Sequence, residues 1–165
     1  EDGTAFVFMG HGTSHTANVT YDQMQSQMDN LGFKNAFIGT VEGEPEDTEC
    51  QAVIAKVKDA GFKKVVLRPL MVVAGDHANN DMAGDDDDSW KSQFNASGAF
   101  DSVDCQIAGL GRIEAVEDLY VEHTKAAIDS LGTADTAEET TDDTAEAADD
   151  TTDGAEEVTD DSAAE

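Results

Sequence analysis

Short apolar runs alternate with amphipathic stretches along the first 131 residues of the chain. Runs rich in β-branched and aromatic residues predict strands at residues 5–9, 36–41, 64–73 and 103–108. Apolar residues at helical spacing predict helices at residues 20–31, 45–61, 88–94 and 113–131. Strands that alternate with helices are typical of a parallel sheet with helices on both faces. The pattern therefore predicts an α/β fold, with a four-stranded parallel sheet and flanking helices.

Two of the predicted strands end in glycine-rich turns that hold a histidine. The run FVFMG is followed by His11, and the run VVLRPLMVV is followed by AGD and then His77. With right-handed crossovers, the carboxyl ends of all four strands lie along one edge of the sheet, where α/β proteins bind ligands. Further polar residues are expected at this edge, namely Glu42, Glu44, Asp76, Asp81 and Arg112. We therefore expect the functional site there.

Two imidazoles and a carboxylate that face one cleft are suitable ligands for a divalent transition metal. On the residues alone, His11 and His77 are equally well explained as ordinary loop histidines, and Glu42 as a solvated turn carboxylate. The Asp85–Asp88 run lacks the alternation of an EF-hand, so it indicates a solvated helix start. Cys50 and Cys105 have no CxxC spacing, and we interpret them as unpaired thiols.

The end of the chain has a different composition from the rest. Residues 133–165 contain no aromatic residue and no Lys or Arg, and they hold 14 of the 37 acidic residues. Such a segment cannot bury enough apolar surface to offset the entropy of ordering it. The sequence therefore predicts two parts, a folded domain at residues 1–132 and a disordered acidic tail at residues 133–165. Either a solubilising role or a weak cation-collecting role is compatible with the tail.

Charge excludes one class of partner. The whole chain has a formal net charge of −28, and residues 1–132 alone contain 23 acidic against 9 basic residues. Nucleic-acid binding requires a basic surface, so we expect no nucleic-acid partner. We expect no membrane span either, because no apolar stretch is long enough to cross a bilayer. Since the chain begins at Glu1 and not at Met, removal of a leader or of a longer preceding segment stays open.

Three segments of the sequence carry a family resemblance, namely MGHGTSH, GTVEGEP and LRPLMVVAGDHANNDMAGDDDDSWKS with the later GLGR. Together they resemble the carboxyl-terminal half of the CbiK-type sirohydrochlorin cobaltochelatases, which are class II tetrapyrrole chelatases. The resemblance extends over residues 5–131, and its third segment is long enough to be specific. It implies insertion of Co²⁺ into sirohydrochlorin during anaerobic cobalamin biosynthesis, with Fe²⁺ or Ni²⁺ as other metals and related tetrapyrroles as other substrates.

The resemblance also implies roles for individual residues. It makes His11, Glu42 and His77 the metal ligands and the catalytic residues. The residues that we expect to bind the tetrapyrrole are Gly10, Gly12, Thr13 and Arg112. Sirohydrochlorin carries eight carboxylates, so we expect a local basic patch from Arg68, Lys91 and Arg112 within an otherwise acidic domain.

Members of the family contain two α/β halves around the tetrapyrrole, and this chain supplies one. We therefore expect either a missing amino-terminal half or a homo-oligomer to complete the cleft. The alternative functions are a non-catalytic module that binds tetrapyrrole or metal, and an inactive half of a split or truncated chelatase. The resemblance favours a cytoplasmic location, with an exported form as the alternative.

Overall fold

The computed structural model describes the backbone of residues 3–138 and the side chains as far as residue 131. The chain divides into two units, Glu1–His123 and Thr124–Glu165. The first unit contains the whole sheet. The part of the predicted acidic tail from residue 139 onward lies outside the described residues.

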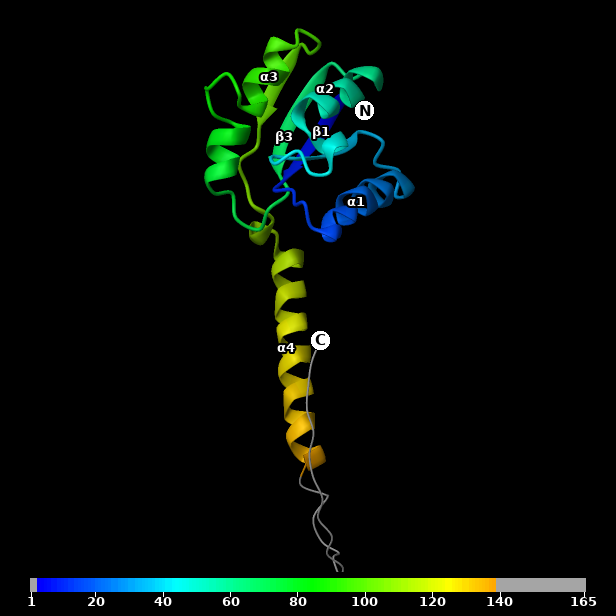
Figure 1. The fold of residues 1–165 in the computed structure, drawn as a ribbon, viewed down its shortest axis with the longest axis vertical. Coiled ribbons are helices and arrows are strands. Elements are labelled where there is room, and N and C mark those ends of the chain that lie inside the picture. The colour runs from blue at the N-terminus through cyan, green and yellow to red at the C-terminus, as the bar shows by residue number, and fades with distance from the viewer. Residues whose placement is uncertain (1–2, 139–165) are drawn as a thin grey trace, which may run out of the picture. The chain divides into compact units, whose positions relative to one another are not determined.

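The first unit is built on a parallel sheet. Its strands are β1 (Thr4–Gly10), β2 (Ala36–Thr40), β3 (Lys64–Pro69) and β4 (Ser102–Cys105), in the order β2-β1-β3-β4 (Figure 1). The central strands β1 and β3 pair from Thr4 with Lys64 to Met9 with Pro69. This arrangement confirms the predicted fold class, and it brings the ends of β1 and β3 together.

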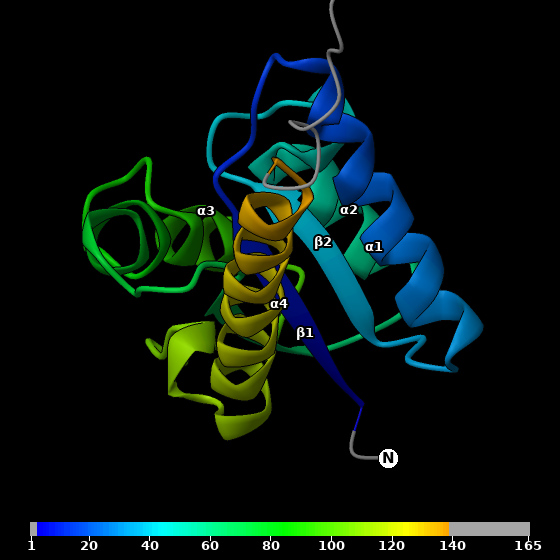
Figure 2. The ribbon, with the colours of Figure 1, turned by 90° about the horizontal axis from the view of Figure 1, so that it is seen from below.

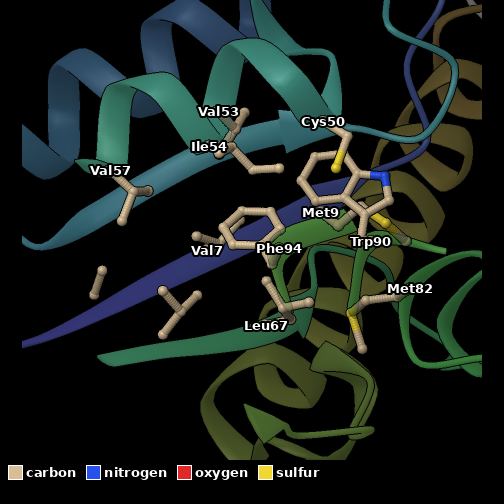
Figure 3. Packing of buried hydrophobic residues seen from close by; sticks show 12 residues of the cluster. Val7, Met9, Cys50, Val53, Ile54, Val57, Leu67, Met82, Trp90 and Phe94 are labelled. Atoms are coloured by element: carbon tan, nitrogen blue, oxygen red, sulfur yellow. The ribbon is translucent and has the colours of Figure 1, made fainter. Parts of the chain in front are cut away.

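Alternation along β1 separates the two faces of the sheet. Ala5, Val7 and Met9 are fully buried, whereas Phe6 and Phe8 point to the other face and are half-buried. Helices α2 (Cys50–Asp59) and α3 (Trp90–Ala96) pack on the first face (Figure 3). Helix α1 (Val19–Asn30) lies on the other face, beside β2 (Figure 2).

The core between the sheet and α2 and α3 is tightly packed around Trp90. A Cβ atom on Gly39 would lie 2.5 Å from the Trp90 ring and 2.9 Å from Val53, so only glycine fits at this point of β2. Phe94 is fully buried and stacks between Trp90 and Phe100. Because interiors at this density leave no room for extra atoms, the carboxyl edge of the sheet has a rigid support.

Three predicted elements of the first unit differ from the observed ones by several residues. The helix predicted from Pro45 is interrupted, because Glu49 adopts an extended conformation between the short η2 (Glu46–Thr48) and α2. The third strand ends at Pro69 and not at Val73, since proline has no N–H with which to continue the ladder. The Leu70 N–H still donates to the Met9 carbonyl at 2.7 Å, and the chain then leaves the sheet. The fourth strand likewise ends early, at Cys105.

Helix α4 (Glu114–Glu138) is longer than predicted and crosses residue 132, where we expected the tail to begin. The division of the chain at that residue stays a prediction. Leu119 and Tyr120 of this helix are 52% and 55% exposed. None of the helices in residues 3–138 has the length and apolar character of a membrane span.

Candidate functional site at the carboxyl edge of the sheet

His11 lies immediately after β1, in a loop held by its glycine neighbours. A Cβ atom on Gly10 would lie 2.6 Å from the ring of Tyr21, and the Gly12 N–H donates to the Tyr21 hydroxyl at 2.9 Å. Gly12 has a φ of +96°, a conformation that other residues rarely adopt. The two glycines therefore let the chain turn closely over α1, which leaves the His11 side chain exposed.

The turn after β2 packs against this loop. The Glu42 N–H donates to the His11 carbonyl at 2.9 Å, and the Thr13 N–H donates to the Glu44 carbonyl at 3.3 Å. A Cβ atom on Gly12 would lie 3.0 Å from the Glu42 Cβ, so the two turns are in close contact. The structure thus places Glu42 next to His11 through the backbone.

His77 begins an irregular turn, the π-helical η3 (Ala78–Met82). Ala78 and Met82 are fully buried and anchor the turn. His77 directly precedes Ala78 and Asp81 directly precedes Met82, and both of these polar side chains are partly exposed. The turn closes at Gly84, where a Cβ atom would lie 2.3 Å from the Asn80 carbonyl oxygen. Its anchors are buried on one side, so its polar side chains point outward on the other.

The two imidazoles meet at the edge of the sheet. The ring centroids of His11 and His77 lie 4.8 Å apart, with the ring planes at 84°. His11 Nδ1 lies 3.0 Å from the Gly12 carbonyl oxygen, and His77 Nδ1 lies 2.5 Å from Asp81 Oδ2. Two side chains that are 66 positions apart in the sequence therefore form one site.

Glu42 and Asp81 share a neighbouring pocket of about 370 Å³. Four carboxylates line it, those of Glu42, Glu49, Asp81 and Asp88. Within the part of the chain that the structure describes, no three His, Cys, Asp or Glu side chains are arranged to hold a metal ion together. The structure therefore joins the two histidines directly, and it links Glu42 to them through the His11 backbone and through this pocket.

The expected basic patch does not form as a cluster of three side chains. Arg68 lies over the Phe8 ring, 5.9 Å from its centroid, on the face of the sheet that carries α1. Lys91 forms an ion pair with Asp85 at 2.9 Å, and this pair lowers the pKa of the Asp85 carboxyl. Arg112 is exposed in η4 (Leu110–Arg112), which follows β4 at the carboxyl edge.

The cysteines are free, as predicted. Cys50 lines the pocket beside Glu42, and burial raises the pKa of its thiol from 9.0 to about 12. Burial also raises the pKa of Cys105, although the nearby Lys91 opposes that shift. Both side chains are therefore neutral thiols near neutral pH, and a neutral thiol is a poor metal ligand.

Sequence reasoning did not assign two of the contacts that shape the site. Tyr21 lies within the helix predicted at residues 20–31 and Asp81 among the polar residues predicted at the edge, but no partner was predicted for either side chain. The contact of Asp81 with His77 has an i, i+4 spacing, but it occurs in a π-helical turn that no residue pattern predicted. Gly10 and Gly12 were the available signal for Tyr21, because small residues permit the close approach of a ring.

Comparison with known proteins identifies the family. The profile of the cobalt chelatase (CbiK) family matches residues 1–129, which is most of the chain. The chain belongs to the cobalt chelatase (CbiK) family. This confirms the resemblance seen in the MGHGTSH, GTVEGEP and LRPLMVVAGDHANND segments.

Two curated relatives show how much of the length of a family member the chain covers. It is 43% identical over 122 residues to the sirohydrochlorin cobaltochelatase of Salmonella typhimurium, covering 74% of this chain and 44% of the relative. It is 35% identical over 129 residues to the sirohydrochlorin cobaltochelatase CbiKC of Nitratidesulfovibrio vulgaris, covering 77% of this chain and 43% of the relative. The chain therefore spans less than half the length of these relatives.

A solved structure supports the fold of this cobalt chelatase family member. The crystal structure of a putative cobalamin (vitamin B12) biosynthesis CbiX protein from Marinobacter aquaeolei matches with a TM-score of 0.59 at 14% sequence identity. The match covers 78% of this chain and 98% of that chain. At this identity the similarity concerns the fold alone.

Proposed function

We propose that this chain handles the metal in a sirohydrochlorin cobaltochelatase, with His11, His77 and Glu42 as metal ligands and catalytic residues. The contact between the His11 and His77 rings, 4.8 Å apart at the carboxyl edge of the sheet, is the observation that supports this function most strongly. Ligands of parallel α/β sheets bind at this edge. The names of the curated relatives give the substrate and the metal of those proteins, and we extend them to this chain.

The chemistry requires a metal to enter the ring as two protons leave it. Co²⁺ replaces the two pyrrole N–H protons of the free tetrapyrrole, and the released protons must go to acceptors beside the ring. Imidazoles both bind divalent transition metals and exchange protons near neutral pH, so His11 and His77 can perform both tasks in turn. The Glu42 carboxylate offsets the charge of the cation while the cation loses its water molecules.

An open site suits a metal that is a substrate. A closed cage of four ligands would retain the ion, whereas two imidazoles on exposed loops can release it to the ring. Affinity alone does not select Co²⁺, because Ni²⁺ and Cu²⁺ bind the same ligands more tightly. We therefore assign selectivity for Co²⁺ over Fe²⁺ or Ni²⁺ to metal supply and to the shape of the macrocycle.

The ring itself would lie over the loops that hold the histidines. Gly10, Gly12 and Thr13 belong to the first of these loops, and Arg112 is an exposed cation that follows β4 at the same edge. We assign Arg112 to a carboxylate of sirohydrochlorin, since guanidinium groups bind carboxylates through paired hydrogen bonds. The strongly acidic chain then needs this contact to offset repulsion of the substrate.

We infer that a second α/β half forms the other wall of the cleft, because the chain spans 43–44% of its relatives. This half is either an amino-terminal half or a second copy of the chain. A cytoplasmic location, which the family favours, and the alternative of an exported form both stay predictions.

Anaerobic absorption spectroscopy tests the activity. The full chain is mixed with sirohydrochlorin and Co²⁺, and the rate of metallation is compared with that of the uncatalysed reaction over a range of protein concentrations. We expect an accelerated rate that falls at least tenfold in His77→Ala and in His11→Ala, because each substitution removes an imidazole from the pair. A rate per chain that rises with protein concentration would identify self-association as the source of the second wall.

His123→Ala is the matched control, since His123 is an exposed histidine on α4 outside the site. Its rate should equal that of the wild-type chain. A steady absorption shift without metallation would instead identify a binding module or an inactive half. Metallation that survives in the double His11→Ala, His77→Ala variant would remove the histidine pair from the mechanism.

A further inference from the structure

We propose that Asp81 is a positioning residue for metal binding, which acts by fixing the tautomer of His77. The inference rests on the proposed function, because it concerns which nitrogen of His77 faces the metal. Asp81 Oδ2 lies 2.5 Å from His77 Nδ1, within one turn of chain. Both side chains are partly exposed, at 36% for His77 and 45% for Asp81, so the contact lies at the surface of the site and not in the core.

The chemistry of the pair determines where the ring proton lies. A neutral imidazole has one N–H group, and an ionised carboxylate can only accept hydrogen bonds. His77 must therefore carry its proton on Nδ1 in order to donate to Asp81, which leaves the lone pair of Nε2 free. Carboxylates that accept from the far nitrogen of a metal-binding histidine orient the ring and make it a stronger ligand.

His11 reaches the same tautomer through a different partner. Its Nδ1 lies 3.0 Å from the Gly12 carbonyl oxygen, which also can only accept. Both rings thus keep their proton on Nδ1 and present Nε2. The ring centroids lie 4.8 Å apart, so the two free nitrogens belong to neighbouring rings of one site.

The turn that holds Asp81 is fixed by packing. Ala78 and Met82 are fully buried, and Gly84 permits the hydrogen bond from its own N–H to the Asn80 carbonyl at 3.0 Å. These contacts keep His77 and Asp81 on the outer side of the same turn. The packing of the folded loop therefore fixes the geometry of the pair.

Nitrogen NMR of the histidine rings tests the inference on the metal-free full chain, with no activity assay. At a pH above the range in which imidazoles titrate, the ring shifts report which nitrogen carries the proton. We expect the Nδ1–H tautomer for both His11 and His77 in the wild-type chain. In Asp81→Ala the His77 signals should move toward the Nε2–H tautomer, whereas the His11 signals should not change.

Binding of Co²⁺ is measured in the same samples, because the paramagnetic ion shifts and broadens the ring signals of its ligands. We expect the Co²⁺ concentration that gives half of the effect on His77 to rise about 10- to 100-fold in Asp81→Ala. Asp81→Asn keeps an oxygen that can accept from Nδ1 and should restore most of the loss. Asp76→Ala is the control, because Asp76 lies in the same loop and accepts from Asn80 at 2.6 Å. Asp76→Ala should leave the His77 tautomer unchanged and the Co²⁺ concentration for half of the effect within about twofold of the wild-type value.

The possible outcomes separate this inference from the proposed function. If Asp81→Ala leaves the His77 tautomer and the Co²⁺ concentration unchanged while the wild-type chain binds Co²⁺, Asp81 has no positioning role and the proposed function stands. Equal losses of Co²⁺ binding in the Ala and Asn variants, with an unchanged tautomer, would make Asp81 a metal ligand and overturn the inference. If the tautomer responds but the wild-type rings do not respond to Co²⁺, the proposed function fails and the control of the His77 tautomer by Asp81 remains.

Discussion

The loops that carry His11 and His77 present the same side chain by different means. The His11 loop is shaped by its backbone, with a positive φ at Gly12, a hydrogen bond from that residue to Tyr21, and a backbone carbonyl as the partner of the ring. The His77 loop is shaped by side chains, with buried anchors on one side of a π-helical turn and a carboxylate as the partner of the ring.

This difference indicates where each half of the site is vulnerable. In the first loop a single added methyl group meets backbone atoms that cannot move aside. In the second loop the backbone has space at Gly75, although the turn closes tightly at Gly84, and the partner of the His77 ring depends on the functional group at position 81. Changes of shape near the histidine should therefore matter more in the first loop, and changes of chemistry at the partner of the ring should matter more in the second.

Gly12→Ala should have the largest effect. The left-handed conformation costs about 1–3 kcal/mol for a residue with a Cβ atom, and that atom would lie 3.2 Å from the Glu44 carbonyl oxygen and 3.0 Å from the Glu42 Cβ. We expect metallation to fall at least tenfold and the free energy of unfolding to fall by about 1–3 kcal/mol. Steady-state metallation and urea unfolding measure the two effects.

Gly75→Ala is the matched change in the other loop, since nothing lies within 4 Å of the position of its Cβ atom. Its metallation rate should stay within about twofold of the wild-type rate. Equal losses in the two variants would mean that the two loops do not differ in the way described.

Tyr21→Phe should have an intermediate effect. The substitution keeps the ring that packs against Gly10 but removes the hydroxyl that accepts from the Gly12 N–H at 2.9 Å. A hydrogen bond of this kind contributes about 0.5–1.5 kcal/mol, so we expect metallation to fall about two- to tenfold. Asn79→Ala is the counterpart in the His77 loop, where an exposed amide donates to the Gly75 carbonyl at 2.7 Å. Its effect on metallation should be smaller, and a larger effect would contradict the comparison.

Cys50→Ala should have the smallest effect on metallation. The thiol lines the pocket beside Glu42, but burial raises its pKa to about 12 and keeps it neutral. We therefore expect the metallation rate of the folded variant to stay within about twofold of the wild-type rate. A tenfold loss would show that a sulfur ligand takes part, and the two histidine loops would then not be the whole metal site.

The raised pKa of Cys50 also predicts how the free energy of unfolding depends on pH in the wild-type chain and in Cys50→Ala. The folded state holds the Cys50 proton more tightly than the unfolded chain, whose thiol titrates near 9.0. This contribution to stability is fully present below about pH 9 and is lost as the pH rises toward 12. Urea unfolding at pH 8 and pH 10.5 should therefore show a smaller loss of stability in Cys50→Ala than in the wild-type chain.

The sequence predicted the strands and most helices well because burial repeats along them. Alternation in β1 and the β-branched run in β3 depend on one local pattern, and both strands occur where that pattern predicts them. The break at Glu49 and the end of β3 at Pro69 depend on single backbone angles and single missing N–H groups, which periodicity does not report. The sequence therefore predicted the existence of helix α2 more accurately than the residue at which this helix begins.

For the candidate site as well, the sequence predicted the general arrangement but not the individual contacts. The convergence of the two loops follows from parallel topology, because His11 comes directly after β1 and His77 lies in the loop that follows the neighbouring strand β3. The contact between His77 and Asp81 depends on a π-helical turn, and turns of this kind have no reliable residue signature. Topology predicts which loops meet, and only coordinates show which atoms face one another.

The carbonyl beside His11 has an evolutionary consequence. Any residue at position 12 that preserves the loop still supplies that oxygen, so the partner of the His11 ring is not encoded by a side chain. The partner of the His77 ring is encoded by one codon, that of Asp81. If the two histidines bind the metal as proposed, point mutation can therefore adjust the donor strength of His77 and leave that of His11 constant, which gives metal affinity a short genetic route to change.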